Sequence, residues 1–179
     1  MIKGKITLSG KSGTGKTSVG KLLASKLGYE LVSVGKFSRE FAKSKYGMSI
    51  DEFQDKCKQE PELDKYIDRE FEKQCNERTN LIIDWRLGFH FVKNAFKVYL
   101  TASDNICFER IRNRNENNEN KDPESIQKKD NEIRERFIDL YGVDLTDTGH
   151  YDLIINTDNF SPELIVDKII SEYTKWCEQ

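Results

Sequence analysis

A run of eight residues near the start of the chain could bind the phosphates of a nucleotide. It has the pattern G-x-x-x-x-G-K-T. The glycines let the backbone curl until its N–H groups point at a phosphate, the lysine adds a full positive charge, and the threonine hydroxyl can bind Mg²⁺. An apolar run precedes the pattern and an amphipathic stretch follows it, which is the strand-to-helix context that such a loop needs. The alternative is a glycine-rich loop that binds nothing. We expect the phosphates of a nucleoside triphosphate to contact Gly10, Lys11, Ser12, Gly13, Thr14, Gly15, Lys16, Thr17 and Ser18.

Composition excludes several classes of protein. The chain has 179 residues, with 29 basic and 31 acidic side chains and a formal net charge of -2, so bulk binding to nucleic acid is not expected. No signal peptide and no apolar run of membrane-spanning length is visible. The four cysteines are scattered, which favours reduced thiols over disulfides or zinc. We therefore expect a cytoplasmic monomer without a membrane partner, whose partners are small-molecule nucleotides.

Strand-like and helix-like segments alternate along the chain. This alternation predicts the α/β class, with a parallel sheet covered by helices on both faces. The length suits a single domain, residues 1–179. Short and mostly continuous apolar runs predict strands at Lys5–Ser9, Glu30–Ser33, Asn80–Asp84, Phe96–Thr101 and Leu153–Asn156. Helices are expected at Thr17–Leu27, Lys36–Lys45, Ser49–Lys58, Pro61–Arg78, Asp104–Arg114, Glu124–Leu140 and Pro162–Trp176.

A second set of chemical groups is expected at the carboxyl edge of the sheet. Asp84 ends an apolar strand, and a carboxylate there can hold a magnesium ion together with Thr17. Arg86 follows two residues later, at the edge where open parallel sheets bind their ligands. Because turns also favour aspartate, Asp84 could instead be a simple turn residue. We favour the functional interpretation of both residues.

Arginines that could surround a transferring phosphate fall into three groups. Arg39 lies in the helix after the second strand, and Arg110 and Arg114 share one face of a later helix. Arg136 lies beyond a polar segment, residues 115–123, which we interpret as the tip of a mobile flap rather than a plain surface loop. The planar guanidinium suits phosphate oxygens and keeps its charge. Arg112 and Arg134 are interpreted as solvated surface charges.

In order and spacing, these motifs resemble those of nucleoside monophosphate kinases, and most nearly the short archaeal-type cytidylate kinases. The resemblance covers nearly the whole chain. It is carried by the phosphate loop, Ser33-Val34-Gly35 with Arg39 and Glu40, Tyr46 to Phe53, Asp64, Asp68-Arg69, Asp84-Trp85-Arg86, Arg110 with Arg114, Tyr141 to Leu145, and Asp152 with Ile155-Asn156-Thr157.

The resemblance implies a P-loop NTPase fold with a five-stranded parallel sheet, a helical insert that binds the nucleoside monophosphate (about 34–79) and a small lid (about 113–137). It implies transfer of the γ-phosphoryl group of ATP to CMP or dCMP with Mg²⁺. Lys16, Arg86, Arg114 and Arg136 would be catalytic, and Arg110 would face the donor. The acceptor would contact Ser33, Gly35, Arg39, Asp64, Asp68 and Arg86.

This chain departs from the family pattern at positions that bear on the acceptor. Lys36 replaces a small polar residue, Trp85 stands where glycine is common, and Lys129 stands where the lid usually carries arginine. Two other functions therefore stay open. One is a different small-molecule P-loop kinase, acting on another nucleoside monophosphate, a nucleoside, a sugar acid or a coenzyme precursor. The other is a nucleotide-binding module without turnover. A phosphorylated acceptor needs convergent cations, whereas a hydroxyl acceptor usually needs a carboxylate base, so the arginines favour the first function.

Overall fold

The structure is a computed structural model that describes residues 4–113 and 122–178. Its centre is a parallel sheet of five strands: β1 (Lys5–Ser9), β2 (Glu30–Ser33), β3 (Leu81–Asp84), β4 (Phe96–Thr101) and β5 (Leu153–Asn156). Their order in the sheet is β2-β3-β1-β4-β5. The central position of β1 places the loop that follows it between the ends of β3 and β4. The predicted α/β class and five-stranded parallel sheet are confirmed.

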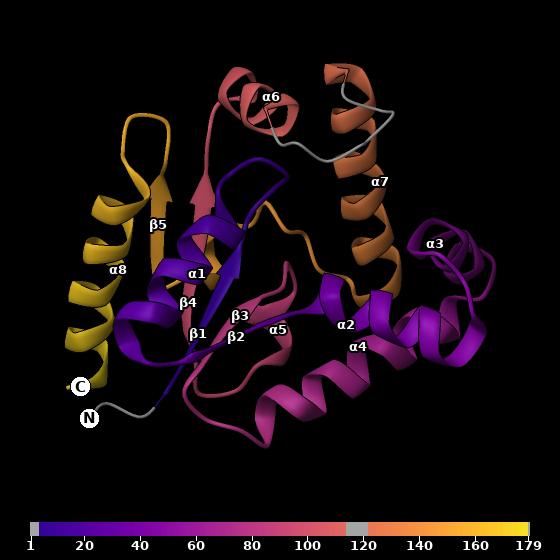
Figure 1. The fold of residues 1–179 in the computed structure, drawn as a ribbon, viewed down its shortest axis with the longest axis horizontal. Coiled ribbons are helices and arrows are strands. Elements are labelled where there is room, and N and C mark those ends of the chain that lie inside the picture. Colours follow the sequence, from indigo (N-terminus) through magenta and orange to yellow (C-terminus); the bar gives the residue numbers. More distant parts are fainter. Residues whose placement is uncertain (1–3, 114–121, 179) are drawn as a thin grey trace.

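The helices lie on both faces of the sheet and beyond its carboxyl edge, as Figure 1 shows. Two further segments are short helices of other types, a π-helical turn (η1) and a 3-10 turn (η2). The bounds are α1 Lys16–Leu27, α2 Val34–Phe41, η1 Ala42–Tyr46, α3 Ile50–Gln59, α4 Pro61–Asn76, α5 Gly88–Phe91, α6 Asp104–Arg112, α7 Pro123–Tyr141, η2 Thr148–His150 and α8 Pro162–Cys177.

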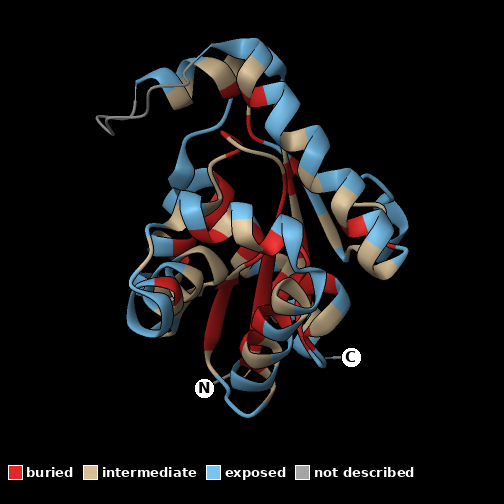
Figure 2. Cartoon of the chain, turned by 90° about the vertical axis from the view of Figure 1, so that its right-hand side faces the viewer, coloured by how far each residue is buried: buried red, intermediate tan, exposed pale blue. Residues whose placement is uncertain are grey.

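Each face of the sheet has its own apolar core, because successive strand residues point to opposite faces. On one face, Ile82 packs with residues of α1 and α8 such as Leu23 and Ile169. On the other face, Ile83 packs with Phe71 of α4 and with residues of α5 and α7. The three central strands β3, β1 and β4 are accordingly largely buried, whereas the edge strands β2 and β5 and the outward faces of the helices are more exposed (Figure 2).

A third, smaller core lies within the segment expected to bind the acceptor. Helices α3 and α4 pack Phe53 and Ile67 against Ala42 of η1. The third core gives α2, η1, α3 and α4 an apolar cluster of their own beside the main sheet. The limits of the insert, about 34–79, and of the lid, about 113–137, stay predictions.

Most differences from the predicted elements lie at their ends. Asn80 adopts a left-handed backbone (φ 59°), so β3 starts one residue later than expected. The helix expected from Lys36 starts at Val34, directly after β2, and changes to a π-helical turn at Ala42. Helix α5 was missed because its few residues show no helical period. The expected flap tip, residues 115–123, lies almost wholly outside the described residues.

Within residues 4–113 and 122–178, none of the helices combines the length and apolar character needed to cross a bilayer. The monomeric state and the cytoplasmic location stay predictions.

Candidate active site

The phosphate loop begins where β1 ends, at the carboxyl edge of the sheet. Its glycines are required by geometry. Gly10 has a φ of 142°, and a Cβ there would lie 2.3 Å from the carbonyl oxygen of Leu100. Gly13 has a φ of 82°, and a Cβ there would lie 2.6 to 2.9 Å from atoms of Cys107. The loop is therefore pressed against the end of β4 and the first turns of α6, a fit that only glycine allows.

Side chains of the loop bind its own backbone. The ammonium of Lys16 donates hydrogen bonds to the carbonyl oxygens of Gly10 and Lys11, at 2.7 and 2.8 Å. The hydroxyl of Thr14 donates to the same Lys11 carbonyl at 2.9 Å. Helix α1 starts at Lys16, so the positive end of its dipole points into the loop. Ser18 is exposed in the first turn of α1. The arrangement is a cradle for an anion, as the sequence predicts.

The two residues expected to bind a metal ion lie side by side. The hydroxyl of Thr17 donates to Oδ2 of Asp84 at 3.0 Å. Strand register explains the meeting, because Asp84 pairs with Leu8 of β1, just before the loop. A carboxylate and a hydroxyl are hard oxygen ligands, and they stand here next to the phosphate cradle. The donor set therefore fits Mg²⁺.

Arg86 reaches the loop from the turn after β3. Its guanidinium donates to Oγ of Ser12 and to Oδ1 of Asp130, both at 2.8 Å. Asp130 belongs to α7, and its carboxylate also accepts from the hydroxyl and the backbone N–H of Ser12, at 3.0 and 3.3 Å. The sequence predicts Arg86 at this edge but does not single out Asp130, because one carboxylate in a highly charged helix forms no pattern.

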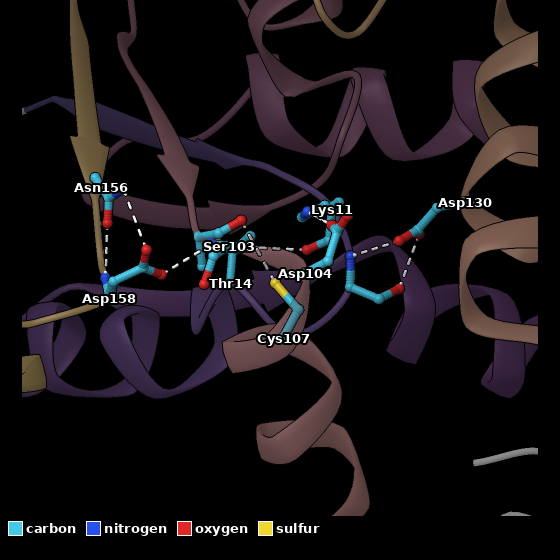
Figure 3. A network of polar contacts seen from close by, with 10 residues as sticks. Lys11, Thr14, Ser103, Asp104, Cys107, Asp130, Asn156 and Asp158 are labelled. Atoms are coloured by element: carbon cyan, nitrogen blue, oxygen red, sulfur yellow. Dashed lines mark hydrogen bonds and ion pairs between the residues drawn. The ribbon is translucent and has the colours of Figure 1, made fainter. Parts of the chain in front are cut away.

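The outer rim of the loop is held by α6 and by the turn after β5 (Figure 3). Lys11 forms an ion pair with Asp104, the first residue of α6. Burial is the largest single effect and lowers the pKa of the Lys11 ammonium, but the hydrogen bond to Asp104 and the attraction of Cys107, Asp104 and Asp130 together raise it above its usual value. Asp158 accepts from the backbone N–H of Ser103 at 2.8 Å and so ties the turn after β5 to the start of α6. Burial raises the pKa of the Cys107 thiol beside the loop, which leaves it a packing residue rather than a nucleophile.

Arg110 was expected to face the donor nucleotide. Its guanidinium donates to the hydroxyl and carbonyl oxygens of Thr157, at 2.8 and 2.7 Å, and to the carbonyl oxygen of Gly13 at 3.4 Å. It therefore joins the turn after β5 to the phosphate loop, beside the expected donor site. A direct contact with the nucleotide stays a prediction.

The expected acceptor residues from β2 and α2 lie together. A Cβ on Gly35 would lie 3.6 Å from a guanidinium nitrogen of Arg39 and 3.7 Å from Oγ of Ser33. Arg39 therefore folds back over the start of its own helix, toward the end of β2. Ser33 is the register partner of Asp84 on the neighbouring strand. Arg39 and Arg86 thus belong to the same edge of the sheet.

Two acidic residues of α4, Asp64 and Asp68, contact α7, and we call them the acidic pair. Oδ2 of Asp64 lies 3.2 Å from Nε of Arg136. Both atoms are buried, and their angle does not make a hydrogen bond, so the contact is an ion pair with unused hydrogen-bonding capacity. One turn further along α4, Asp68 accepts a hydrogen bond from the hydroxyl of Tyr141 at 2.7 Å. The structure thus brings both predicted acceptor carboxylates to α7: Asp64 contacts Arg136, which the sequence analysis assigns to the lid, and Asp68 contacts Tyr141.

Comparison with known proteins agrees with this geometry. A family model described as an AAA domain matches residues 6–136. The cytidylate kinase of Archaeoglobus fulgidus is 36% identical over 93% of this chain and 92% of its own length. That of Sulfurisphaera tokodaii is 38% identical over 94% and 93%. The chain belongs to the archaeal-type cytidylate kinase family. The resemblance seen in the sequence motifs is therefore confirmed, and so is a kinase-type P-loop fold.

Three further proteins define how far the family assignment extends. A protein of Lacinutrix mariniflava named S-adenosylmethionine-dependent nucleotide dehydratase is 49% identical over 97% of this chain, which spans only 37% of that protein. Shikimate kinase from Acinetobacter baumannii, solved with shikimate, has a TM-score of 0.62 at 20% identity and covers 96% and 93% of the two chains. A gluconokinase from Sinorhizobium meliloti has a TM-score of 0.62 at 16% identity. These two structures show the shared fold alone.

Among the other arginines of this cytidylate kinase family member, Arg134 forms an exposed ion pair with Asp144, at 2.6 Å, as expected for a surface charge. Arg112 is exposed at the end of α6. Arg114, predicted to be catalytic, lies outside the described residues, and its role stays a prediction.

Burial makes the carboxyl group of Asp68 harder to ionise. It raises the pKa of this carboxyl to about 6, although the hydroxyl of Tyr141 stabilises the charged form and opposes the shift. Burial likewise raises the pKa of Asp64, against the attraction of Arg136. Burial therefore destabilises the ionised form of both carboxyl groups. A partner that donates hydrogen bonds to them would stabilise that form.

We expect the free energy of unfolding of Asp68→Asn, relative to that of the original chain, to increase as the pH rises from 4 to 7. Because the pKa of Asp68 is raised to about 6 in the folded state, its contribution to stability is complete below pH 4 and is lost as pH rises through 6. The difference is on the order of 3 kcal/mol. Urea unfolding at several pH values measures it. Asp139→Asn, which removes an exposed carboxylate from α7, controls for the loss of one charge; a pH-independent difference for Asp68→Asn would contradict the prediction.

Proposed function

We propose that this protein transfers the γ-phosphoryl group of ATP to a nucleoside monophosphate, with CMP and dCMP as preferred acceptors, and releases ADP and the nucleoside diphosphate. The observation that carries the proposal is the placement of two arginines beside the phosphate cradle. Arg86 contacts Ser12 of the loop, and Arg39 lies at the end of the neighbouring strand. An acceptor that is itself a phosphate needs such paired cations, because its negative charge must approach that of ATP.

The mechanism requires no enzyme nucleophile. An oxygen of the acceptor phosphate attacks the γ-phosphorus in line, the bond to the bridging oxygen of ADP breaks, and no general base is needed because that phosphate is already ionised at neutral pH. Lys16 and the backbone N–H groups of the loop stabilise the charge on the transferring group. Arg86 lies between the two halves of the site and orients the acceptor phosphate.

Mg²⁺ bound by Thr17 and Asp84 would neutralise charge on the β- and γ-phosphates. The hydroxyl and carboxylate are already within hydrogen-bond distance of each other, so little rearrangement is needed for both to face one ion.

The acidic pair supports a cytosine acceptor. Cytosine presents an exocyclic amino group, which donates hydrogen bonds, and Asp64 has a buried carboxylate oxygen with unused accepting capacity. Asp68 lies one turn away, against Tyr141. A base whose corresponding edge carries a carbonyl oxygen would face these carboxylates with like polarity. Several relatives of this length are named cytidylate kinases, which supports the same preference.

A panel of acceptors tests the proposal. ATP consumption is measured with CMP, dCMP, UMP, AMP and GMP, and with cytidine, shikimate and gluconate as acceptors that offer only a hydroxyl group. We expect CMP and dCMP to give the highest kcat/KM and the hydroxyl acceptors to give none above background. Preference for AMP, GMP or a hydroxyl acceptor would overturn the proposed specificity. Absence of transfer to every acceptor would overturn the kinase proposal.

In a second candidate function, the protein catalyses the same phosphoryl transfer and its product is the substrate of a dehydratase. The identity of 49% to part of a protein named a nucleotide dehydratase favours a kinase that supplies phosphorylated nucleotide to a dehydratase. The test is a coupled assay in which the products made from CMP and ATP are offered to the Lacinutrix mariniflava protein from which the segment that matches this chain has been removed. Dehydration that depends on an active kinase would support this function, and dehydration unchanged by omission of the kinase would reject it.

A further inference from the structure

Asp130 makes contacts that a phosphate would make. Its two carboxylate oxygens accept from the backbone N–H of Ser12, the hydroxyl of Ser12 and the guanidinium of Arg86, at 2.8 to 3.3 Å. A loop N–H, a loop hydroxyl and an arginine are the donors that P-loops and phosphate clamps offer to phosphate oxygens. The carboxylate therefore has the charge, the geometry and the partners of an anion bound at the rim of the cradle.

The contact is shielded from water. The side chains of Arg86 and Asp130 are only 18% and 16% exposed. Ser12 and Asp130 also line a cavity of about 200 Å³ between the loop, α6 and α7. A shielded charge pair keeps most of its attraction in salt, in contrast to an exposed pair such as that of Arg134 on α7 with Asp144 beyond the end of the helix. Asp130 is thus well placed to compete with a ligand for these donors.

The helix that carries Asp130 also reaches the acceptor side. Helix α7 runs from beside α6 toward the insert, as Figure 1 shows. Near its other end, Arg136 pairs with Asp64, and Tyr141 donates to Asp68, both on α4. One rigid helix therefore contacts the phosphate loop at Asp130 and the acidic pair at Arg136 and Tyr141. Movement of the loop end of α7 would therefore also shift the contacts of α7 with Asp64 and Asp68.

We propose that Asp130 is a positioning residue whose carboxylate holds Arg86 and Ser12 in the place of a substrate phosphate and is displaced when that phosphate binds. The inference rests on the proposed function, because it requires phosphate binding at the loop. Displacement of Asp130 frees Arg86 for the substrate and releases the loop end of α7. Asp130 thereby sets how tightly phosphates bind.

The competition has a measurable cost. If the donors are occupied by Asp130 in most molecules, the apparent affinity for a phosphate ligand is the intrinsic affinity reduced by the fraction in which they are available. Removal of the carboxylate makes the donors available in all molecules, so the apparent affinity rises to the intrinsic affinity. We expect inorganic tripolyphosphate to bind Asp130→Asn about tenfold more tightly than the original chain, if about one molecule in ten has the donors available.

Isothermal titration calorimetry with tripolyphosphate measures the effect without any acceptor. Asp130→Ala is a second variant, because an asparagine amide oxygen can still accept from Ser12; we expect its gain to equal or exceed that of Asp130→Asn. Glu132→Gln removes an exposed carboxylate from the same helix and is the matched control, for which no gain is expected. Thermal melts show that each variant is folded.

Repetition at high salt separates displacement from general electrostatics. If the gain in tripolyphosphate affinity comes only from lower negative charge near the loop, it should disappear at about 1 M salt, where the Debye length is about 3 Å. That result would overturn the proposal. A gain that persists there while Glu132→Gln stays unchanged supports it. Equal or weaker binding by both Asp130 variants would also overturn it. Tripolyphosphate binding is measured without any acceptor, so failure of this inference can be distinguished from failure of the acceptor panel.

Discussion

Replacement of Lys16 by alanine is expected to lower turnover by about 10³-fold while the protein stays folded, because charge stabilisation of the transferring group dominates phosphoryl transfer. The ammonium of Lys16 lies at the centre of the loop, where it bonds the carbonyl oxygens of Gly10 and Lys11. A γ-phosphate in the cradle would meet this charge directly. Kinetics with saturating CMP and ATP measure the loss in kcat.

The matched control is Lys21→Ala, which removes an exposed lysine from the same helix. It should change neither turnover nor the thermal midpoint. Lys16→Ala also removes two hydrogen bonds that hold the loop. Lys16→Arg separates the effect of charge from that of geometry, because it keeps the charge and changes the shape of the donor group. Turnover of Lys16→Ala within a few-fold of the original chain would contradict the assignment of the active site to this loop.

The scaffold of the site could be predicted from the sequence because its signals are local. Continuous apolar runs located all five strands, and the glycine pattern located the loop between β1 and α1. The pairing of Asp84 with the end of β1 follows from the strand order, which the structure supplies. Local signals fail where the backbone changes type. The π-helical turn at Ala42–Tyr46 and the left-handed Asn80 interrupt elements whose side-chain pattern continues through them.

The polar contacts within the site could not be predicted in the same way. Asp130 and Ser12 are 118 positions apart, and Tyr141 and Asp68 are 73 apart. Such contacts depend on the rotation and placement of α7, which its own sequence does not encode. Nor does the sequence show that the Arg86 guanidinium is shared between Ser12 and Asp130. Residue types and spacing therefore nominate candidate site residues, while tertiary packing decides which of them are in contact.

The second large effect is expected for Arg86→Ala, which should lower kcat/KM for CMP by about 10³-fold, as loss of a phosphate-clamping arginine does in other phosphoryl transfers. Arg86 contacts Ser12 of the loop from the turn after β3, on the side expected to bind the acceptor, so kcat should fall and the KM for CMP should rise. Arg86→Lys should recover only part of the loss, because lysine keeps the charge but not the planar fork. Steady-state kinetics with CMP as the varied substrate separate the two parameters.

Arg134→Ala is the control for loss of an arginine, since Arg134 pairs with Asp144 at the surface, and its kinetics should be unchanged. Arg86→Ala has a second consequence: Asp130 keeps its contacts with Ser12 and no longer has a cation beside it, so its charge repels the incoming phosphates. The double variant Arg86→Ala/Asp130→Asn should therefore bind ATP more tightly than Arg86→Ala alone and remain just as impaired in transfer. Recovery of turnover in the double variant would show that Arg86 serves only to neutralise Asp130, and would remove it from the catalytic machinery.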